Sequence, residues 1–99
     1  MRAVFDPQAQ AEFIEARQQY ELKSAGLGDE FAESVRQGLR RVLAQPLSCP
    51  IEVSVFRRLV IKRFPYKLMY SVEADYVYVL AVAHQRQEQA YWYSRIPDA

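Results

Sequence analysis

Apolar residues in the first half of the chain recur at the spacing of an α-helix. Phe13, Ala16 and Tyr20 form one stripe, and a second follows at positions 31, 35, 39, 42 and 43. This spacing predicts two amphipathic helices. Asp6-Pro7 is a good helix start, because the Asp side chain can accept hydrogen bonds from free backbone N–H groups and proline suits the first helical position. We therefore predict one helix over residues 7–24 and a second from the acids after GLG to about residue 45.

Glycine and proline residues delimit the two predicted helices. Gly26 ends the first helix, and Pro46 ends the second because proline has no backbone N–H and clashes with the preceding turn. Gly38 lies beside the second apolar stripe, where a missing side chain would let the first helix approach closely. The two helices are thus expected to pack together as a hairpin.

From residue 51 onward the apolar pattern has a period of two, which is typical of β-strands. Ile51, Val53 and Val55 alternate with polar residues, and three β-rich runs follow: RRLVIKRF, PYKLMYSV and DYVYVLAVAH. A further strand is predicted at Arg2 to Phe5. The order β-α-α-β-β-β predicts an α+β fold with a helical hairpin packed on one face of a small, mainly antiparallel sheet. Residues 1–99 are expected to form a single domain, since chains of this length seldom divide.

The sheet face opposite the helices should be polar, yet the last two strands have apolar residues on both faces. In the last strand, one side carries Val77, Val79, Ala81 and Ala83, and the other carries Tyr76, Tyr78, Leu80 and Val82. The strand before it carries Tyr66, Leu68, Tyr70 and Val72 on one side. Either side chains from the termini cover the second face, or a partner protein does. Trp92 is expected to be a packing anchor that closes the core.

Composition favours a globular protein of the cytoplasm. Hydrophobic residues make up 51% of the chain, but no apolar run approaches the roughly 20 residues of a membrane span. The N-terminus lacks the apolar core of a signal peptide, and the lone Cys49 has no partner for an internal disulfide. With one His and one Cys, no metal site is expected. The net charge of +1 argues against a protein that coats nucleic acid by bulk charge.

Positive charge is concentrated between Val53 and Val72, a stretch with five basic residues and no acidic one. Its arginine side chains match both phosphate and carboxylate groups, so this surface could follow phosphates or pair with an acidic protein segment. The alternative is a solvated strand face that limits edge-to-edge aggregation. His84 is a candidate acid or base, because histidine titrates near neutral pH. Its alternative role is to end a strand with one ring nitrogen bonded to the backbone.

The chain contains GLGDEF, then RRLVIKRFPYKLMYSV, then YVLAVAHQRQEQAYW. In this order and spacing, these segments resemble the ParE/RelE superfamily of toxins from bacterial type II toxin-antitoxin systems, over residues 3–95. The resemblance implies a cytoplasmic toxin without a cofactor. It also implies an antitoxin whose C-terminal segment wraps across hydrophobic and basic surfaces of the toxin, in a complex that can be a higher-order hetero-oligomer.

Members of this superfamily differ in their targets, and the resemblance leaves open whether this chain is an enzyme. ParE-like toxins poison DNA gyrase, whereas RelE-like toxins cleave messenger RNA in the ribosomal A site. The GLGDEF and RFPY segments look more like the ParE side, so gyrase inhibition is the first expectation. The alternatives are a ribosome-dependent mRNA endonuclease and a non-toxic, degenerate module that only binds its antitoxin.

The resemblance, together with the charge pattern and the chemistry of histidine, gives candidate site residues for each activity. The catalytic candidates, should the chain be a nuclease, are Lys67, Arg86, Tyr91 and His84. The candidates for antitoxin or target binding are Arg57, Arg58, Lys62, Arg63, Tyr66, Tyr70 and Arg86. Lys67 stands where RelE-like toxins often carry an arginine, and Gln87 stands where many members show a second one. These departures weaken the nuclease interpretation, because RNA cleavage needs cations to stabilise the charge on phosphate.

Overall fold

The computed structural model describes residues 1–86 and 89–96. Its elements are β1 (Arg2–Phe5), α1 (Pro7–Lys23), α2 (Leu27–Ala44), β2 (Ile51–Val53), β3 (Phe56–Val60), β4 (Tyr66–Val72), β5 (Tyr76–His84) and the 3-10 helix η1 (Gln89–Arg95). The five strands form one sheet in the order β1-β5-β4-β3-β2, in which β1 pairs parallel to β5 and the other pairs are antiparallel. The predicted α+β fold is confirmed, with the short strand β2 as an additional element.

The helices form where the sequence predicts them. The Asp6 side chain accepts a hydrogen bond from the backbone N–H of Gln8 at 2.9 Å, which caps the start of α1. Gly26, with φ of 87°, turns the chain from α1 into α2, a left-handed conformation that glycine adopts at little cost. Within the described residues, no helix is both long and apolar enough to cross a membrane.

Gly38 allows a close approach, but of a different element from the one predicted. A Cβ atom at Gly38 would lie 2.7 Å from Cδ2 of Leu59, so it is the side chain of β3 that packs against α2 here. The contact with α1 is made at Gly28, where a Cβ atom would lie 2.7 Å from the carbonyl oxygen of Arg17. The prediction for Gly38 was wrong because the helical pattern does not specify which neighbour faces a given side of the helix.

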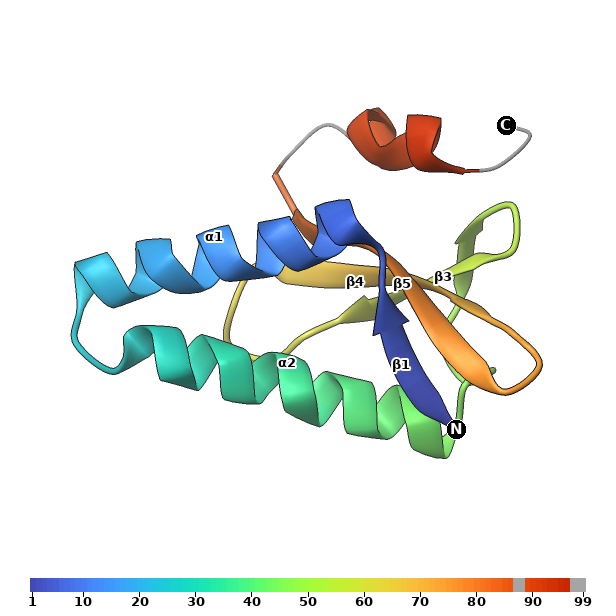
Figure 1. The fold of residues 1–99 in the computed structure, drawn as a ribbon, viewed down its shortest axis with the longest axis horizontal. Helices are drawn as coiled ribbons and strands as arrows, with labels where there is room; N and C mark the ends of the chain where they lie inside the picture. Colours follow the sequence, from blue (N-terminus) through green and yellow to red (C-terminus); the bar gives the residue numbers. More distant parts are fainter. Residues whose placement is uncertain (87–88, 97–99) are drawn as a thin grey trace.

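Two hydrophobic clusters lie on opposite faces of the sheet. The first joins both helices to the sheet and includes Phe31, Val35, Leu59, Leu68, Tyr70, Val77, Val79 and Val82. The second consists of Phe56, Met69, Leu80, Ala81, Ala83, Trp92 and Ile96. Figure 1 shows α2 and η1 on opposite sides of β4 and β5. The C-terminal residues of the chain therefore cover the second face, and Trp92, with no exposed surface, is confirmed as a packing anchor.

A β-bulge changes the face of the sheet on which the later residues of β5 lie. Met69 pairs with Ala81 but Tyr70 pairs with Val79, so Leu80 is an extra residue in β5. Val77 and Val79 lie on the face that packs against the helices, and after the bulge Val82 lies on that same face. Ala81 and Ala83 were predicted on the same face as Val79, and they lie instead in the second cluster. The alternation in β4 is confirmed, because a strand without an inserted residue keeps its period of two.

Candidate functional site

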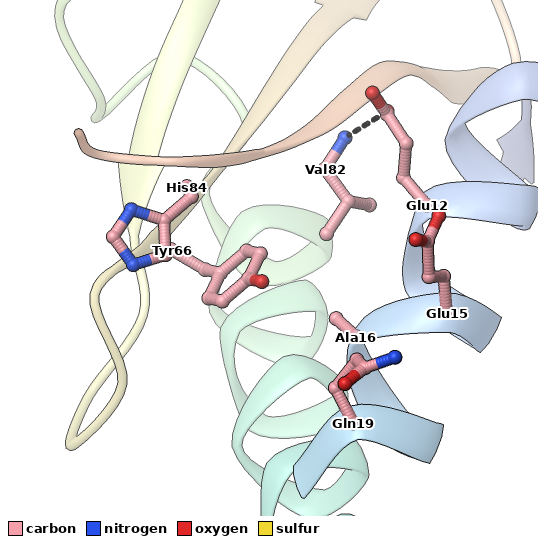
Figure 2. Close-up of a pocket in the computed structure, with 7 residues that line it drawn as sticks. All are labelled: Glu12, Glu15, Ala16, Gln19, Tyr66, Val82 and His84. Atoms are coloured by element: carbon pink, nitrogen blue, oxygen red, sulfur yellow. Dashed lines mark hydrogen bonds between the residues drawn. The ribbon is translucent and has the colours of Figure 1, made fainter. Parts of the chain in front are cut away.

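An open pocket lies between α1 and the C-terminal end of β5, and it holds two of the predicted site residues. Its lining residues are Glu12, Glu15, Ala16, Gln19, Tyr66, Val82 and His84, around a volume of about 330 Å³. Figure 2 shows the α1 residues on one side and the rings of Tyr66 and His84 on the other. The two ring centroids are 5.1 Å apart, with the rings edge to face. The pocket therefore combines carboxylates with aromatic rings.

His84 ends β5, and its ring is held by the backbone that follows. The backbone N–H of Arg86 donates a hydrogen bond to Nδ1 of His84 at 3.0 Å. This contact confirms the alternative in which the histidine ends a strand with one ring nitrogen bonded to the backbone. The side chain of Arg86 is exposed and does not line the pocket. Gln87, which was named as a departure from the superfamily pattern, lies outside the described residues.

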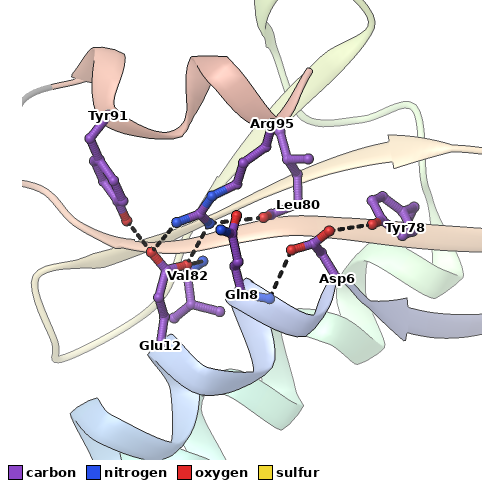
Figure 3. A network of polar contacts seen from close by, with 8 residues as sticks. All are labelled: Asp6, Gln8, Glu12, Tyr78, Leu80, Val82, Tyr91 and Arg95. Carbon is purple, nitrogen blue, oxygen red and sulfur yellow. Dashed lines mark hydrogen bonds and ion pairs between the residues drawn. The ribbon is translucent and has the colours of Figure 1, made fainter. Parts of the chain in front are cut away.

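Glu12 connects α1, β5 and η1 through hydrogen bonds that sequence reasoning missed. Its Oε1 accepts from the backbone N–H of Val82 at 3.0 Å and from Nη1 of Arg95 at 2.9 Å. Its Oε2 accepts from the Tyr91 hydroxyl at 2.6 Å and from Nη2 of Arg95 at 3.0 Å. Figure 3 shows Tyr91 and Arg95 reaching from η1 to this one carboxylate. Glu12 thereby fastens the C-terminal helix to the rest of the fold.

The surroundings of Tyr91 keep its hydroxyl protonated. Burial, together with the hydrogen bond to the Glu12 carboxylate, raises the pKa of Tyr91 well above the ordinary value for tyrosine. Because its pKa is raised, the phenolate form of Tyr91 is even less populated near neutral pH than that of free tyrosine, so little of the side chain is in a form that could accept a proton. Tyr91 therefore acts here as a hydrogen-bond donor to Glu12.

Lys67 is buried and paired within the fold. Its Nζ lies 3.1 Å from both carboxylate oxygens of Glu52 and 5.9 Å from the centroid of the Trp92 ring. The Lys67 and Glu52 side chains are each only 9% exposed. The ammonium group is consequently neutralised by Glu52 on the η1 side of the sheet and is not presented to solvent.

Three further candidates on the sheet also have partners inside the protein. Arg57 donates from Nη1 to the carbonyl oxygens of Leu47 and Cys49, at 3.1 and 2.6 Å, and so holds the loop after α2. Arg58 pairs with Glu52 at 3.3 Å. The Tyr70 side chain is buried, and its hydroxyl donates to the carbonyl oxygen of Pro46 at 2.8 Å. These contacts give the three side chains structural roles, whatever they bind.

Lys62 and Arg63 lie on the connection between β3 and β4, where both are exposed. Arg63 has a φ of 74°, and its Nη1 lies 3.0 Å from Oε1 of Glu30 on α2. Positive φ is uncommon for residues other than glycine and marks a tight change of chain direction. The structure therefore brings these two cations to α2 and not to the pocket at His84.

Tyr78 and Asp6 form a hydrogen bond between β5 and the start of α1. The Tyr78 hydroxyl donates to Oδ1 of Asp6 at 2.6 Å, while Oδ2 of the same carboxylate caps α1 (Figure 3). Burial, with this hydrogen bond as the next cause, raises the pKa of Tyr78 to about 12 from the ordinary 10.0. The Asp6 carboxylate thus links the start of α1 to strand β5.

We expect this contact to make stability fall at alkaline pH. Because the folded-state pKa of Tyr78 is above the unfolded value, the folded protein keeps a proton that the unfolded chain loses, and the free energy of unfolding falls as pH rises from 10.0 towards about 12. Below that range the contribution of Tyr78 is fully present. Thermal melts should show that the melting temperature falls less between pH 8 and pH 11 for Tyr78→Phe than for the wild type. Tyr76→Phe is the control, and an equal loss in all three proteins would contradict the prediction.

Comparison with known proteins agrees with this fold. The model of a protein family described as "ParE toxin of type II toxin-antitoxin system, parDE" matches residues 3–89. The chain is also similar to the solved structure "Chromosomal ParDE TA system from P. aeruginosa", with 17% sequence identity and a TM-score of 0.60, over 85% of this chain and 95% of that chain. No curated protein shows a significant match. At this identity the structural likeness supports the fold, and the family model supports the membership.

Proposed function

We propose, from the premise that this chain belongs to the ParE toxin family of type II toxin-antitoxin systems, that it acts in the cytoplasm by binding and inhibiting DNA gyrase. A cognate antitoxin of the ParD kind is proposed to neutralise it. The proposal requires a surface that binds a large protein and requires no catalytic group in the toxin itself.

The observation that carries this proposal is the state of the groups that a nuclease would use. Metal-free RNA cleavage needs a base, an acid and cations near the phosphate. Lys67 is neutralised by Glu52, and the pKa of Tyr91 is raised. The pocket at His84 is lined by Glu12 and Glu15, and no lysine or arginine of the described residues lines it. Glu12 is already paired with Arg95, which leaves Glu15, among the described residues, as the unpaired carboxylate of the pocket and no lining cation to hold a phosphodiester, and this favours inhibition by binding over cleavage.

The surface left for the antitoxin differs from the one that the sequence pattern suggested. Because η1 covers much of the second sheet face, the exposed large apolar residues near the sheet are found instead around β2 and β3: Leu47, Ile51, Val55 and Val60. Strand β2 is also an edge of the sheet, and one side of it has backbone groups free to pair with another chain. We therefore propose that the antitoxin docks along this edge, beside Arg57 and Arg58, in a hetero-oligomeric complex.

A supercoiling assay tests the proposed target. Purified toxin, added to gyrase and relaxed plasmid, is expected to prevent supercoiling. We expect Arg86→Ala to reduce this inhibition by roughly tenfold or more without changing the melting temperature, because the side chain is exposed and a single interface arginine can contribute 2 kcal/mol or more, on the order of the largest interface terms. Arg2→Ala, also exposed, is the control and should inhibit like the wild type. In cells, the DNA-damage response should begin before translation falls.

Mapping of message ends after induction gives the opposing result. Prompt codon-linked cuts on translated mRNA, abolished by Tyr91→Phe while supercoiling is unaffected, would replace gyrase inhibition with ribosome-dependent cleavage. Tyr91→Phe is the cleaner variant, because Lys67→Ala would leave the buried Glu52 with Arg58 as its only ion-pair partner among the described residues and so would also change stability. Binding to the antitoxin with no effect in either assay would identify a non-toxic module.

A further inference from the structure

A polar groove on α2 lies apart from the pocket at His84. Its first hollow, of about 270 Å³, is lined by Ser34, Gln37, Arg40, Arg41 and Lys62. A second hollow, of about 240 Å³, shares Ser34, Gln37 and Lys62 with the first and adds Glu30, Glu33 and Arg63. The shared residues make the two hollows one continuous surface, which we call the α2 groove. All of its lining side chains are polar or charged.

The charges of the α2 groove leave two cations unneutralised. Arg63 pairs with Glu30 at 3.0 Å, and Arg40 pairs with Glu33 at 3.0 Å. Each carboxylate that lines the groove is thus already paired with an arginine of the same groove. Arg41 and Lys62 have no carboxylate within ion-pair distance among residues 1–86 and 89–96. Both line the first hollow, so two free positive charges face one cavity.

The backbone around these cations is held in place by contacts between α2 and the β3–β4 connection. The Ser34 hydroxyl donates to the carbonyl oxygen of Lys62 at 2.6 Å, which fixes the connection against the helix. Gly38 leaves no room for a side chain, since its Cβ atom would lie 2.7 Å from Leu59 Cδ2 and 3.4 Å from Ile61 Cγ2. Ile61 immediately precedes Lys62, so this buried packing fixes the backbone of Lys62 against α2, the helix that carries Arg41.

We infer that the α2 groove binds the phosphate backbone of duplex DNA. Arginine and lysine side chains, with serine and glutamine as further donors, make most protein contacts to phosphate oxygens. A protein partner would be expected to bury apolar or aromatic anchors at the centre of its interface, and the groove lining has none. Protein–DNA interfaces, by contrast, are polar and positively charged.

This contact is weak and independent of sequence, and it supplements the binding of gyrase. The chain has a net charge of only +1, so it is not a DNA-binding protein by bulk charge. The choice of DNA over other polyanions rests on the proposed function, because gyrase is bound to DNA while it works. A toxin docked on gyrase with its α2 groove on the duplex would gain affinity from two linked contacts.

Fluorescence anisotropy with a labelled 20-base-pair duplex and the full chain tests the inference. If Arg41 and Lys62 each neutralise one phosphate, the binding constant should fall about 12-fold between 50 and 200 mM salt, from a slope of about −1.8 in log–log form. The Arg41→Gln/Lys62→Gln variant should lose about tenfold in affinity at 50 mM salt, and its salt slope should approach zero. Both side chains are exposed, so the variant is expected to fold.

Arg2→Gln/Lys23→Gln is the matched control, because it removes the same charge from side chains that lie over tyrosine rings and outside the α2 groove. It should keep the salt slope of the wild type. Equal losses in the two double variants, or no duplex binding at 50 mM salt, would overturn the inference. So would tighter binding of single-stranded RNA or of a polyglutamate peptide at the groove. The assay contains no gyrase, so its failure and a failure to inhibit supercoiling are separate results.

Discussion

Replacing Trp92 with alanine is expected to lower the free energy of unfolding by about 3 to 5 kcal/mol. Trp92 has no exposed surface, and it packs against residues of β4 and β5 that include Met69 and Leu80. Removing the indole would leave a cavity on the η1 side of the sheet, which the short 3-10 helix cannot refill from within. For a chain of this size, the melting temperature should fall by about 12 °C or more.

Tyr93 supplies the control for this prediction. Tyr93 directly follows Trp92 in the sequence, and the centroids of the two rings are 4.6 Å apart in an edge-to-face arrangement. Tyr93 is only half-buried, however. Tyr93→Ala should therefore cost clearly less than Trp92→Ala. The indole Nε1 of Trp92 has no hydrogen-bond partner among the described residues, so Trp92→Phe should recover much of the loss. An unchanged melting temperature for Trp92→Ala would show that η1 contributes little to the core.

Replacing Glu12 with alanine is expected to lower the free energy of unfolding by about 3 kcal/mol, the low end of the cost of breaking a buried ion pair. The substitution would leave the guanidinium of Arg95, whose side chain is 13% exposed, without its carboxylate. It would also remove the acceptor of the Tyr91 hydroxyl and of the Val82 backbone N–H. Chemical denaturation at neutral pH measures the change.

Glu15 offers a matched control one turn further along α1. It lines the same pocket but is exposed and has no ion pair among the described residues. Glu15→Ala should change stability by no more than about 0.5 kcal/mol, as is usual for surface substitutions. Glu12→Gln should fall between the two, because the amide keeps one acceptor oxygen but carries no charge. Equal effects at the two positions would show that the hydrogen bonds of Glu12 do not fasten η1.

The helices and most of the strands could be predicted from the sequence because their signals are local. The stripe that includes Phe31 and Val35 predicted α2, and both residues are buried against the sheet. Asp6 was predicted to cap α1 and does so. In β4, the alternation of Tyr66, Leu68 and Tyr70 predicted that these residues share one face, and all three lie in or against the cluster that joins the helices to the sheet. Each of these patterns spans only a few turns or pairs of residues, so neighbours along the chain suffice to define it.

The candidate site was predicted only in part. Tyr66 and His84 lie together because β4 and β5 are paired strands, and the backbone contact of His84 was one of the two alternatives considered. The burial of Lys67 was not foreseen, since a lysine at an alternating strand position is normally exposed to solvent. Its partner Glu52 is 15 residues away. No spacing rule connects the two residues.

The sequence by itself therefore determined the α+β class, both helices and the resemblance to a toxin family, while tertiary structure decided what the polar side chains do. Glu12 and Arg95 are 83 residues apart, and only the packing of η1 against α1 and β5 brings them together. The bulge at Leu80 and the covering of the second face by Trp92 likewise arise from pairing and packing across the sheet. The physical reason is that the spacing of apolar residues in the sequence shows which face of a helix or strand is apolar. The partner that packs on that face is fixed by contacts between segments far apart in the sequence.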